Sequence, residues 1–180
     1  MHFLEYFYNN NFKYDLINKF YYANIKKIPT ITKIILNFKC NNNDLKNLSS
    51  TMLAIEIITN QKGTLTKSKH SIVYLKIRKG NPTGCKVILK KKLLINFLTN
   101  QLIEILPKTK NFNVKNNKQM VKKTNTFSYK IKNNFYFSKL ENHYYLFNSL
   151  PTLNITIVTN TNNKNEILFI LKTFKIQFII

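Results

Sequence analysis

The stretch NQKGTLTKSKHSIVYLKIRKGNPTGCKVILK, residues 60–90, decides the fold of this chain. In it, lysines alternate with β-branched and other apolar residues, as expected for strands that have one solvated side. Gly80, Pro82 and Gly84 interrupt the pattern. Because glycine and proline mark turns and bends, we expect a strand-rich hairpin over residues 64–89, bent at these three positions and carrying a basic tip.

Four segments of the chain alternate apolar and polar residues. Side chains alternate across a strand, so each segment has an apolar face opposite a polar, mostly cationic one. The apolar sets are Ile34, Leu36 and Phe38; Cys85, Val87 and Leu89; Phe127, Tyr129 and Ile131; and Leu153, Ile155 and Ile157. The opposite sets are Lys33 and Asn37; Lys86 and Lys90; Ser128, Lys130 and Lys132; and Asn154 and Thr156. A solvated sheet face would show the same pattern, but lysine on three strands favours a face that contacts RNA.

Helical spacing separates these strands. We expect an opening helix over residues 3–22, a helix from Asn43 or Asp44 onward with Leu45, Leu48, Met52 and Ile55 on one face, and a helix over residues 94–106 ended by Pro107. A final helix begins near Asn163, with Glu166 positioned as in a capping box. Residues 108–125 form a lysine- and asparagine-rich loop. The pattern predicts one α+β domain over residues 1–180: an antiparallel sheet with helices packed on one face, and an open face and a projecting basic hairpin for RNA.

Composition limits the class of protein. The 29 lysines and arginines against 7 acidic residues give a net charge of +22, while 44% of the residues are hydrophobic. That hydrophobic share excludes a disordered polycation, and the charge favours a polyanionic partner, with nucleic acid first and an anionic membrane surface second. Arg78 is the sole arginine. Abundant Lys, Asn, Ile and Phe, whose codons are AT-rich, indicate an AT-biased genome such as that of an organelle or a reduced endosymbiont.

The residues that carry enzyme chemistry are scattered. The carboxylates form no close pair in sequence, and His2, His70 and His143 lack neighbouring ligands at metal-binding spacing. Cys85 with a distant histidine could act as a nucleophile, but a buried strand cysteine is the simpler interpretation. We therefore predict no catalytic residue, metal or cofactor. Residues 167–180 are apolar but short and broken by two lysines, so we expect no membrane span, and the first residues resemble no import peptide.

The hairpin segment closely resembles the signature of the universal large-subunit ribosomal protein number five family, which binds 5S rRNA in the central protuberance. The matching residues are Gln61, Lys62, Thr66, Lys67, Ser71, Lys76, Ile77, Arg78, Gly80, Pro82, Gly84, Cys85, Lys86, Val87 and Leu89. Outside the signature, IPTITKIILNF (28–38), FSYKI (127–131) and TLNITIVTNTNNKNEILFILKTFKIQF (152–178) are similar to the family's first strand, a later strand, and the final strand and helix.

The resemblance implies an α+β fold whose open sheet face holds 5S rRNA, and it places Lys33, Asn37, Gln61 and Ser128 among the contacts. Together with the cations of the hairpin, the expected RNA-binding set is Lys33, Asn37, Gln61, Lys62, Thr66, Lys67, Lys69, Lys86, Lys90 and Ser128. The hairpin tip is expected near P-site tRNA, through Ser71, Lys76, Arg78, Lys79 and Gly80. Further expected partners are large-subunit rRNA, a small-subunit head protein at an intersubunit bridge, and neighbouring central-protuberance proteins.

This sequence departs from the family pattern at a few positions. Ile88 replaces a hydrogen-bonding threonine of the family, Lys90 replaces an arginine, and Asn154 replaces an aspartate. The side chain of Ile88 cannot make the hydrogen bond that threonine makes. Together with the AT bias, the resemblance predicts a mitochondrial ribosomal protein of the matrix, bound to 5S rRNA or to the rRNA that replaces it. The alternatives are an organellar intron-encoded endonuclease or maturase, which needs acidic metal ligands that form no motif here, and a peripheral membrane protein.

Overall fold

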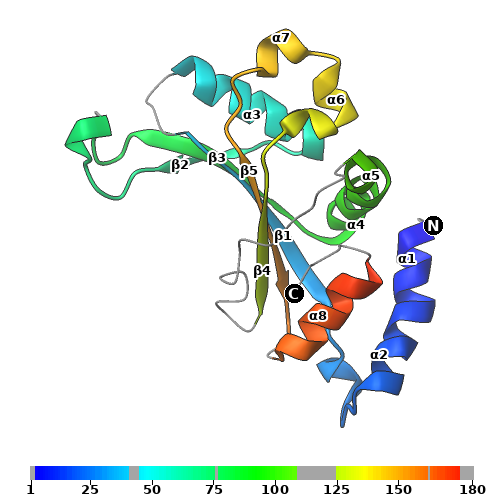
Figure 1. Cartoon of the computed structure of the whole chain (residues 1–180). Helices are drawn as coiled ribbons and strands as arrows, with labels where there is room; N and C mark the ends of the chain where they lie inside the picture. The colour runs from blue at the N-terminus through cyan, green and yellow to red at the C-terminus, as the bar shows by residue number, and fades with distance from the viewer. Residues whose placement is uncertain (1–2, 41–44, 76, 109–124, 162, 175–180) are drawn as a thin grey trace. The chain divides into compact units, whose positions relative to one another are not determined.

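The computed structural model describes residues 3–40, 45–75, 77–108, 125–161 and 163–174. It contains a five-stranded antiparallel sheet with helices packed against it, in the order β2-β3-β1-β5-β4 (Figure 1). The strands are β1 (Ile31–Lys39), β2 (Thr64–Lys67), β3 (Pro82–Leu89), β4 (Thr126–Ile131) and β5 (Leu153–Thr159). The α+β class expected from the sequence is therefore confirmed.

The helical elements lie between the strands. The α-helices are α1 (Phe3–Phe7), α2 (Lys13–Lys19), α3 (Leu45–Thr59), α4 (Lys91–Asn100), α5 (Leu106–Lys108), α6 (Ser138–Glu141), α7 (Tyr144–Phe147) and α8 (Lys164–Thr173). Two π-helical segments, η1 (Tyr8–Phe12) and η4 (Gln101–Ile105), continue α1 and α4. Short 3-10 turns occur at η2 (Ile25–Lys27), η3 (Val73–Leu75) and η6 (Asn134–Tyr136).

The chain divides into two compact units, whose boundaries fall within strands β1, β4 and β5 and between β3 and α4. The first unit comprises residues 1–34, 90–129 and 156–180, and the second comprises residues 35–89 and 130–155. Each unit has its own helices and buried apolar residues.

The strand alternation expected from the sequence is confirmed. In β1, the side chains of Ile34, Leu36 and Phe38 are fully buried, while the residues between them are partly exposed. The apolar members of β3, β4 and β5 are buried in the same alternating manner. In each of these strands one face is therefore buried in the core, and the polar side chains lie on the opposite face.

Helix α3 packs on the apolar side of β3 in the second unit. A side chain at Gly63 would meet the Sγ atom of Cys85 at 2.5 Å and Ile55 at 3.6 Å, so glycine lets the chain leave α3 close to the strand. The buried face of α3 consists of Thr51, Ala54, Ile55, Ile58 and Thr59. The expected stripe that begins at Leu45 is wrong at its start, because Leu45 is 77% exposed. The expected apolar stripe ends at Ile55, whereas α3 continues to Thr59, and the later turns of the helix pack on the sheet.

Gly84 lies inside β3, beside the register shift at which Thr66 pairs with Gly84 and Lys67 pairs with Pro82. A β-carbon at this position would lie 2.3 Å from the carbonyl oxygen of Phe38, so only glycine allows the neighbouring strand to come this close. Gly80, by contrast, adopts a φ of +90°, a conformation that residues with a side chain rarely adopt. The turn expected near Gly80 is therefore confirmed.

Aromatic side chains join the helices of the first unit. The Tyr8 ring stacks on Phe12 at 5.2 Å, and Phe12 lies 5.5 Å from Phe174 at the end of α8. Phe20 packs edge-on against Phe169 at 5.9 Å. The opening helix ends at Lys19, earlier than expected, because Phe20 adopts an extended conformation there.

Two helix ends differ from their expected form. Pro107 lies within α5 and so does not end the helix. The π-helical segment η4 immediately precedes Pro107. In an α-helix the proline ring would clash with the backbone carbonyl four residues earlier, and the wider turns of a π-helix relieve this clash. At α8, the expected capping box is incomplete, because the Asn163 side chain makes no bond to the helix backbone. Its Nδ2 atom instead donates a hydrogen bond to Oε1 of Glu166 at 2.8 Å.

The face assignment of β1 predicts opposite stabilities for two neighbouring variants. Leu36→Ala leaves a cavity among fully buried residues and should lower the free energy of unfolding by about 2–5 kcal/mol. Asn37→Ala removes a partly exposed side chain and should cost less than about 1 kcal/mol. Urea unfolding followed by circular dichroism measures both values, and a larger loss for Asn37→Ala would reverse the face assignment.

Candidate nucleic-acid interface

The basic hairpin belongs to the second unit and is built on the β2–β3 ladder. The strands are antiparallel, with Thr64 opposite Lys86 and Leu65 opposite Cys85, and the register shifts between Thr66 and Lys67. The Thr64 hydroxyl donates a hydrogen bond to the Lys86 carbonyl oxygen at 3.0 Å. The ladder therefore holds the base of the hairpin and fixes which side chains of β3 point away from α3.

The hairpin tip is closed by its own backbone hydrogen bonds. Ile72 and Ile77 form a bridge with N–H···O distances of 2.8 and 3.1 Å, and the amide of Ser68 donates to the Asn81 carbonyl at 2.8 Å. Ile77 is only 6% exposed, so the tip buries this apolar side chain. Val73 and Tyr74, in contrast, are 89% and 84% exposed. The tip therefore presents two apolar side chains beside its cations.

Most of the cations expected to bind RNA on the hairpin are exposed. The exposed members are Lys62, Lys67, Lys69, Lys86, Arg78 and Lys79, together with Ser71 and Gly80, whereas Thr66 is partly buried. Lys76 lies outside the described residues. Residues 60–90 contain no aspartate or glutamate, so no carboxylate of this segment competes with a polyanion for its lysines.

The polar side of the second unit's strands carries two unsatisfied amide groups. Asn37 of β1 and Asn154 of β5 are each partly buried, and the Oδ1 atom of each accepts no hydrogen bond from the described residues. A buried carbonyl oxygen without a donor is unfavourable and is expected to find one in a complex. Lys86 is exposed on the polar side of β3. Asn154 lies on the expected polar face, but sequence reasoning did not name it as a contact.

Gln61 follows the end of α3, where the backbone is fixed locally. Its amide donates to Oγ1 of Thr59 at 3.2 Å, and the same hydroxyl donates to the carbonyl of Ile55 at 2.7 Å. Asn60 between them has a positive φ of 53°. This turn leaves the side chain of Gln61 partly exposed. Gln61 therefore joins Asn37, Lys62 and Lys86 as an expected contact of the second unit.

The remaining expected contacts belong to the first unit. Lys33 is partly exposed on β1, and Ser128 is exposed on β4. The Ser128 and Thr156 hydroxyl groups lie 3.0 Å apart and form a hydrogen bond, so the Ser128 hydroxyl already has a partner. Lys90 is exposed and immediately precedes α4. In the first unit, sequence reasoning missed a pocket that contains Tyr22 and Glu166, which is described below.

The two cysteines lie on the apolar side of the second unit. Both are buried and free, and the Cys40 sulfur lies 3.9 Å from the Thr51 hydroxyl oxygen. Burial, with a smaller effect from Cys40, raises the pKa of the Cys85 thiol to about 11. At neutral pH this thiol is therefore protonated and a poor nucleophile, which agrees with the interpretation as a buried strand cysteine.

Within the part of the chain that the structure describes, no three His, Cys, Asp or Glu side chains gather in a way that could hold a metal ion. Among the described helices, none combines the length and apolar character that crossing a membrane requires.

Comparisons with known proteins agree with the sheet and hairpin described above. Residues 82–178 match the family model for the C-terminus of the ribosomal L5 family. The chain is 34% identical to the large ribosomal subunit protein uL5m of Reclinomonas americana, over 94% of this chain and 93% of the relative. It is 31% identical to the large ribosomal subunit protein uL5 of Geotalea daltonii, over 95% of each chain. It is 34% identical to the uL5 protein of Wigglesworthia glossinidia brevipalpis, over 96% of each.

We expect different effects on stability from replacing a buried and an exposed residue of the hairpin tip. Ile77→Ala removes a buried side chain and should lower the free energy of unfolding by about 2–4 kcal/mol. Tyr74→Ala removes a side chain that is 84% exposed, and should change the free energy of unfolding by no more than about 0.5 kcal/mol. Urea denaturation compares the two variants. A large loss for Tyr74→Ala would mean that this ring packs within the protein and is not available to a partner.

Proposed function

The chain belongs to the ribosomal L5 family of large-subunit proteins, and we propose that its polar sheet face and basic hairpin bind ribosomal RNA. The proposed RNA is 5S rRNA in the central protuberance or, in a ribosome without it, the large-subunit rRNA that takes its place. The hairpin tip is proposed to reach P-site tRNA and the small-subunit head. Neighbouring central-protuberance proteins complete the proposed set of partners.

The observation that carries the proposal is the pair of unsatisfied amide oxygens on β1 and β5, together with the exposed lysine on β3. Asn37 and Asn154 each have a buried Oδ1 atom without a donor among the described residues, and Lys86 is exposed on the polar side of β3. RNA supplies what these groups lack, because its 2′-hydroxyls donate hydrogen bonds and its phosphates attract ammonium groups. None of the five strands contains an acidic residue that would repel the phosphates.

The hairpin suits phosphate contact at its sides and a second RNA at its tip. Lys67 and Lys69 are exposed near the end of β2, and Arg78 and Lys79 are exposed beyond the Ile72–Ile77 bridge. The planar guanidinium of Arg78 can bind a phosphate through two hydrogen bonds or stack on a base. The exposed Tyr74 ring adds a surface for stacking. Its own backbone hydrogen bonds, between Ile72 and Ile77 and between Ser68 and Asn81, hold the tip closed.

The proposed location is the mitochondrial ribosome. Its support is the similarity to the uL5m protein of Reclinomonas americana, together with the AT-biased residue usage of the chain. The large positive charge suits any compartment in which the protein is assembled onto RNA.

The proposed function predicts RNA binding that weakens strongly as salt increases. Each phosphate contact contributes a slope of about −0.7 to −0.9 in the plot of log affinity against log salt. Lys86→Gln should reduce the slope by about one such contact. Lys139→Gln changes an exposed lysine on α6 instead, and should leave the slope unchanged. Fluorescence anisotropy with 5S rRNA measures each slope. A flat salt response of the unaltered protein would overturn the proposal.

The hairpin tip predicts a separation between assembly and tRNA binding. Arg78→Glu should leave incorporation into large subunits nearly unchanged, because the sheet face is intact. It should weaken retention of P-site tRNA by about 1–3 kcal/mol, the cost of reversing one charged contact. Quantitative cosedimentation measures incorporation, and filter binding of labelled tRNA measures retention, with Lys139→Glu as the control. Failure of Arg78→Glu to assemble would instead assign the tip to ribosomal RNA.

A further inference from the structure

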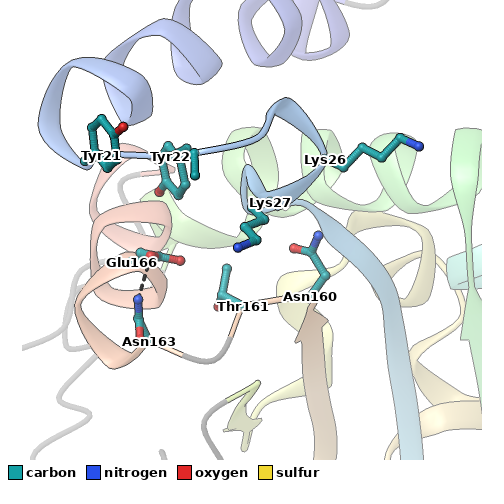
Figure 2. A pocket seen from close by; sticks show the side chains of 9 residues that line it. Tyr21, Tyr22, Lys26, Lys27, Asn160, Thr161, Asn163 and Glu166 are labelled. Carbon is teal, nitrogen blue, oxygen red and sulfur yellow. Dashed lines mark hydrogen bonds between the residues drawn. The ribbon is translucent and has the colours of Figure 1, made fainter.

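A pocket in the first unit lies between the segment after α2 and the beginning of α8. Its volume is about 490 Å³, and its lining includes Tyr21, Tyr22, Lys27, Asn160, Asn163 and Glu166 (Figure 2). None of these residues belongs to the contacts proposed above. The pocket is polar, and its size is typical of sites for small ligands.

A buried carboxylate forms one wall of this pocket. Glu166 is only 7% exposed, and Asn163 donates one hydrogen bond to its Oε1 atom at 2.8 Å. Among the described residues, no lysine pairs with Glu166. A carboxylate that is nearly buried with a single donor is poorly compensated for the water it has lost. It is therefore suited to accept further hydrogen bonds from a ligand.

A hydrogen-bond donor without a partner lies in the same pocket. The hydroxyl of Tyr22 is buried and makes no hydrogen bond with the described residues. Burial, and to a smaller degree the charge of Glu166, raises the pKa of Tyr22 to about 12, so the hydroxyl keeps its proton at neutral pH. Figure 2 shows the Tyr22 hydroxyl and the Lys27 ammonium group pointing to the side where the Glu166 carboxylate lies. The pocket therefore combines an acceptor with two donors.

The rim of the pocket adds a flat surface and positive charge. Tyr21 is 95% exposed, although aromatic rings are usually covered, and its ring is free to stack on a base. Lys26 and Lys27 are exposed in the turn η2 and can approach a phosphate. Together these groups match the three parts of a nucleotide: a base edge, a base face and a phosphate.

We propose that this pocket binds one unpaired guanosine nucleotide of an RNA chain. The base edge that faces a carboxylate must offer donors, and guanine alone places two adjacent donors, N1–H and N2–H, on its Watson–Crick edge. The O6 atom beside them accepts a hydrogen bond from Tyr22 or Lys27. Adenine and cytosine offer one amino group beside a bare ring nitrogen, and uracil places its N–H between two carbonyls, which repel a carboxylate.

The inference rests on the RNA-binding function proposed above but uses different residues. The phosphate near Lys26 and Lys27 belongs either to an RNA chain or to a free nucleotide, because the recognised chemistry is the same. We assign it to RNA because the pocket opens beside exposed lysines, in a chain whose net charge of +22 favours a polyanion over a mononucleotide.

The test compares RNA hairpins that differ only in one bulged nucleotide, guanosine or adenosine, and a matched hairpin without a bulge. The unaltered protein should bind the guanosine bulge about tenfold more tightly than the adenosine bulge, as expected for one bidentate base contact. Glu166→Gln should abolish this preference, because an amide has a single acceptor oxygen, while that oxygen still accepts from Asn163. Tyr22→Phe should reduce it. Lys172→Gln, an exposed position of α8 outside the pocket, should leave it unchanged.

The ratio of the two affinities is the measured quantity, so a general loss of stability does not imitate the effect. Thermal melting of each variant confirms folding. Equal binding of both bulges by the unaltered protein, or an unchanged preference in Glu166→Gln, would overturn the proposal. Binding of guanosine 5′-monophosphate as tight as that of the bulged RNA would overturn its assignment to an RNA chain. Salt-dependent RNA binding without a guanosine preference would overturn the pocket alone, whereas the absence of any RNA binding would overturn the proposed function as well.

Discussion

Burial of one face of the sheet is the constraint on which the rest of the structure depends. In β1, β3, β4 and β5, alternate side chains are buried and their neighbours are not. Each fully buried aliphatic or aromatic side chain contributes about 1.5–3 kcal/mol relative to an exposed one, so a shift of register by one residue would be very unfavourable. The close approach at Gly84, where a β-carbon would collide with the Phe38 carbonyl, shows how tightly the strands are set. The register thereby decides which side chains are left for a partner.

The function proposed for the chain follows from the polar side chains that remain on the other face of the sheet. Lysine, asparagine, serine and threonine occupy the polar positions of the strands, and none of the five strands contains an acidic residue. A polar face of this kind is stable in water without a partner, yet the Asn37 and Asn154 oxygens lack donors within the described chain. The chain belongs to the ribosomal L5 family, and the side chains proposed to face RNA come from the same strands as its core.

Local patterns predicted the strands well and the helix ends poorly. Alternation at Leu36 and Asn37 depends on neighbours within one strand, so the sequence shows it directly. The burial of Thr51 rather than Leu45 and the close approach of Gly84 to Phe38 depend on packing between segments distant in sequence. The pocket was missed for the same reason, since Tyr22 and Glu166 meet only after folding. The hairpin and its cations were predicted from charge and spacing, whereas the particular RNAs expected to contact them came from the resemblance.

Lysine footprinting in the assembled large subunit tests the central claim most directly. An amine-reactive acylating reagent modifies exposed lysines, and mass spectrometry compares the free protein with the protein in large subunits. Lys86 and Lys130 lie on the polar side of their strands, while Lys139 is exposed on α6. The account predicts strong protection of Lys86 and Lys130 on assembly, with a smaller change at Lys139. Unprotected Lys86 and Lys130 together with a protected Lys139 would contradict it, because RNA would then cover the helices rather than the polar face of the sheet.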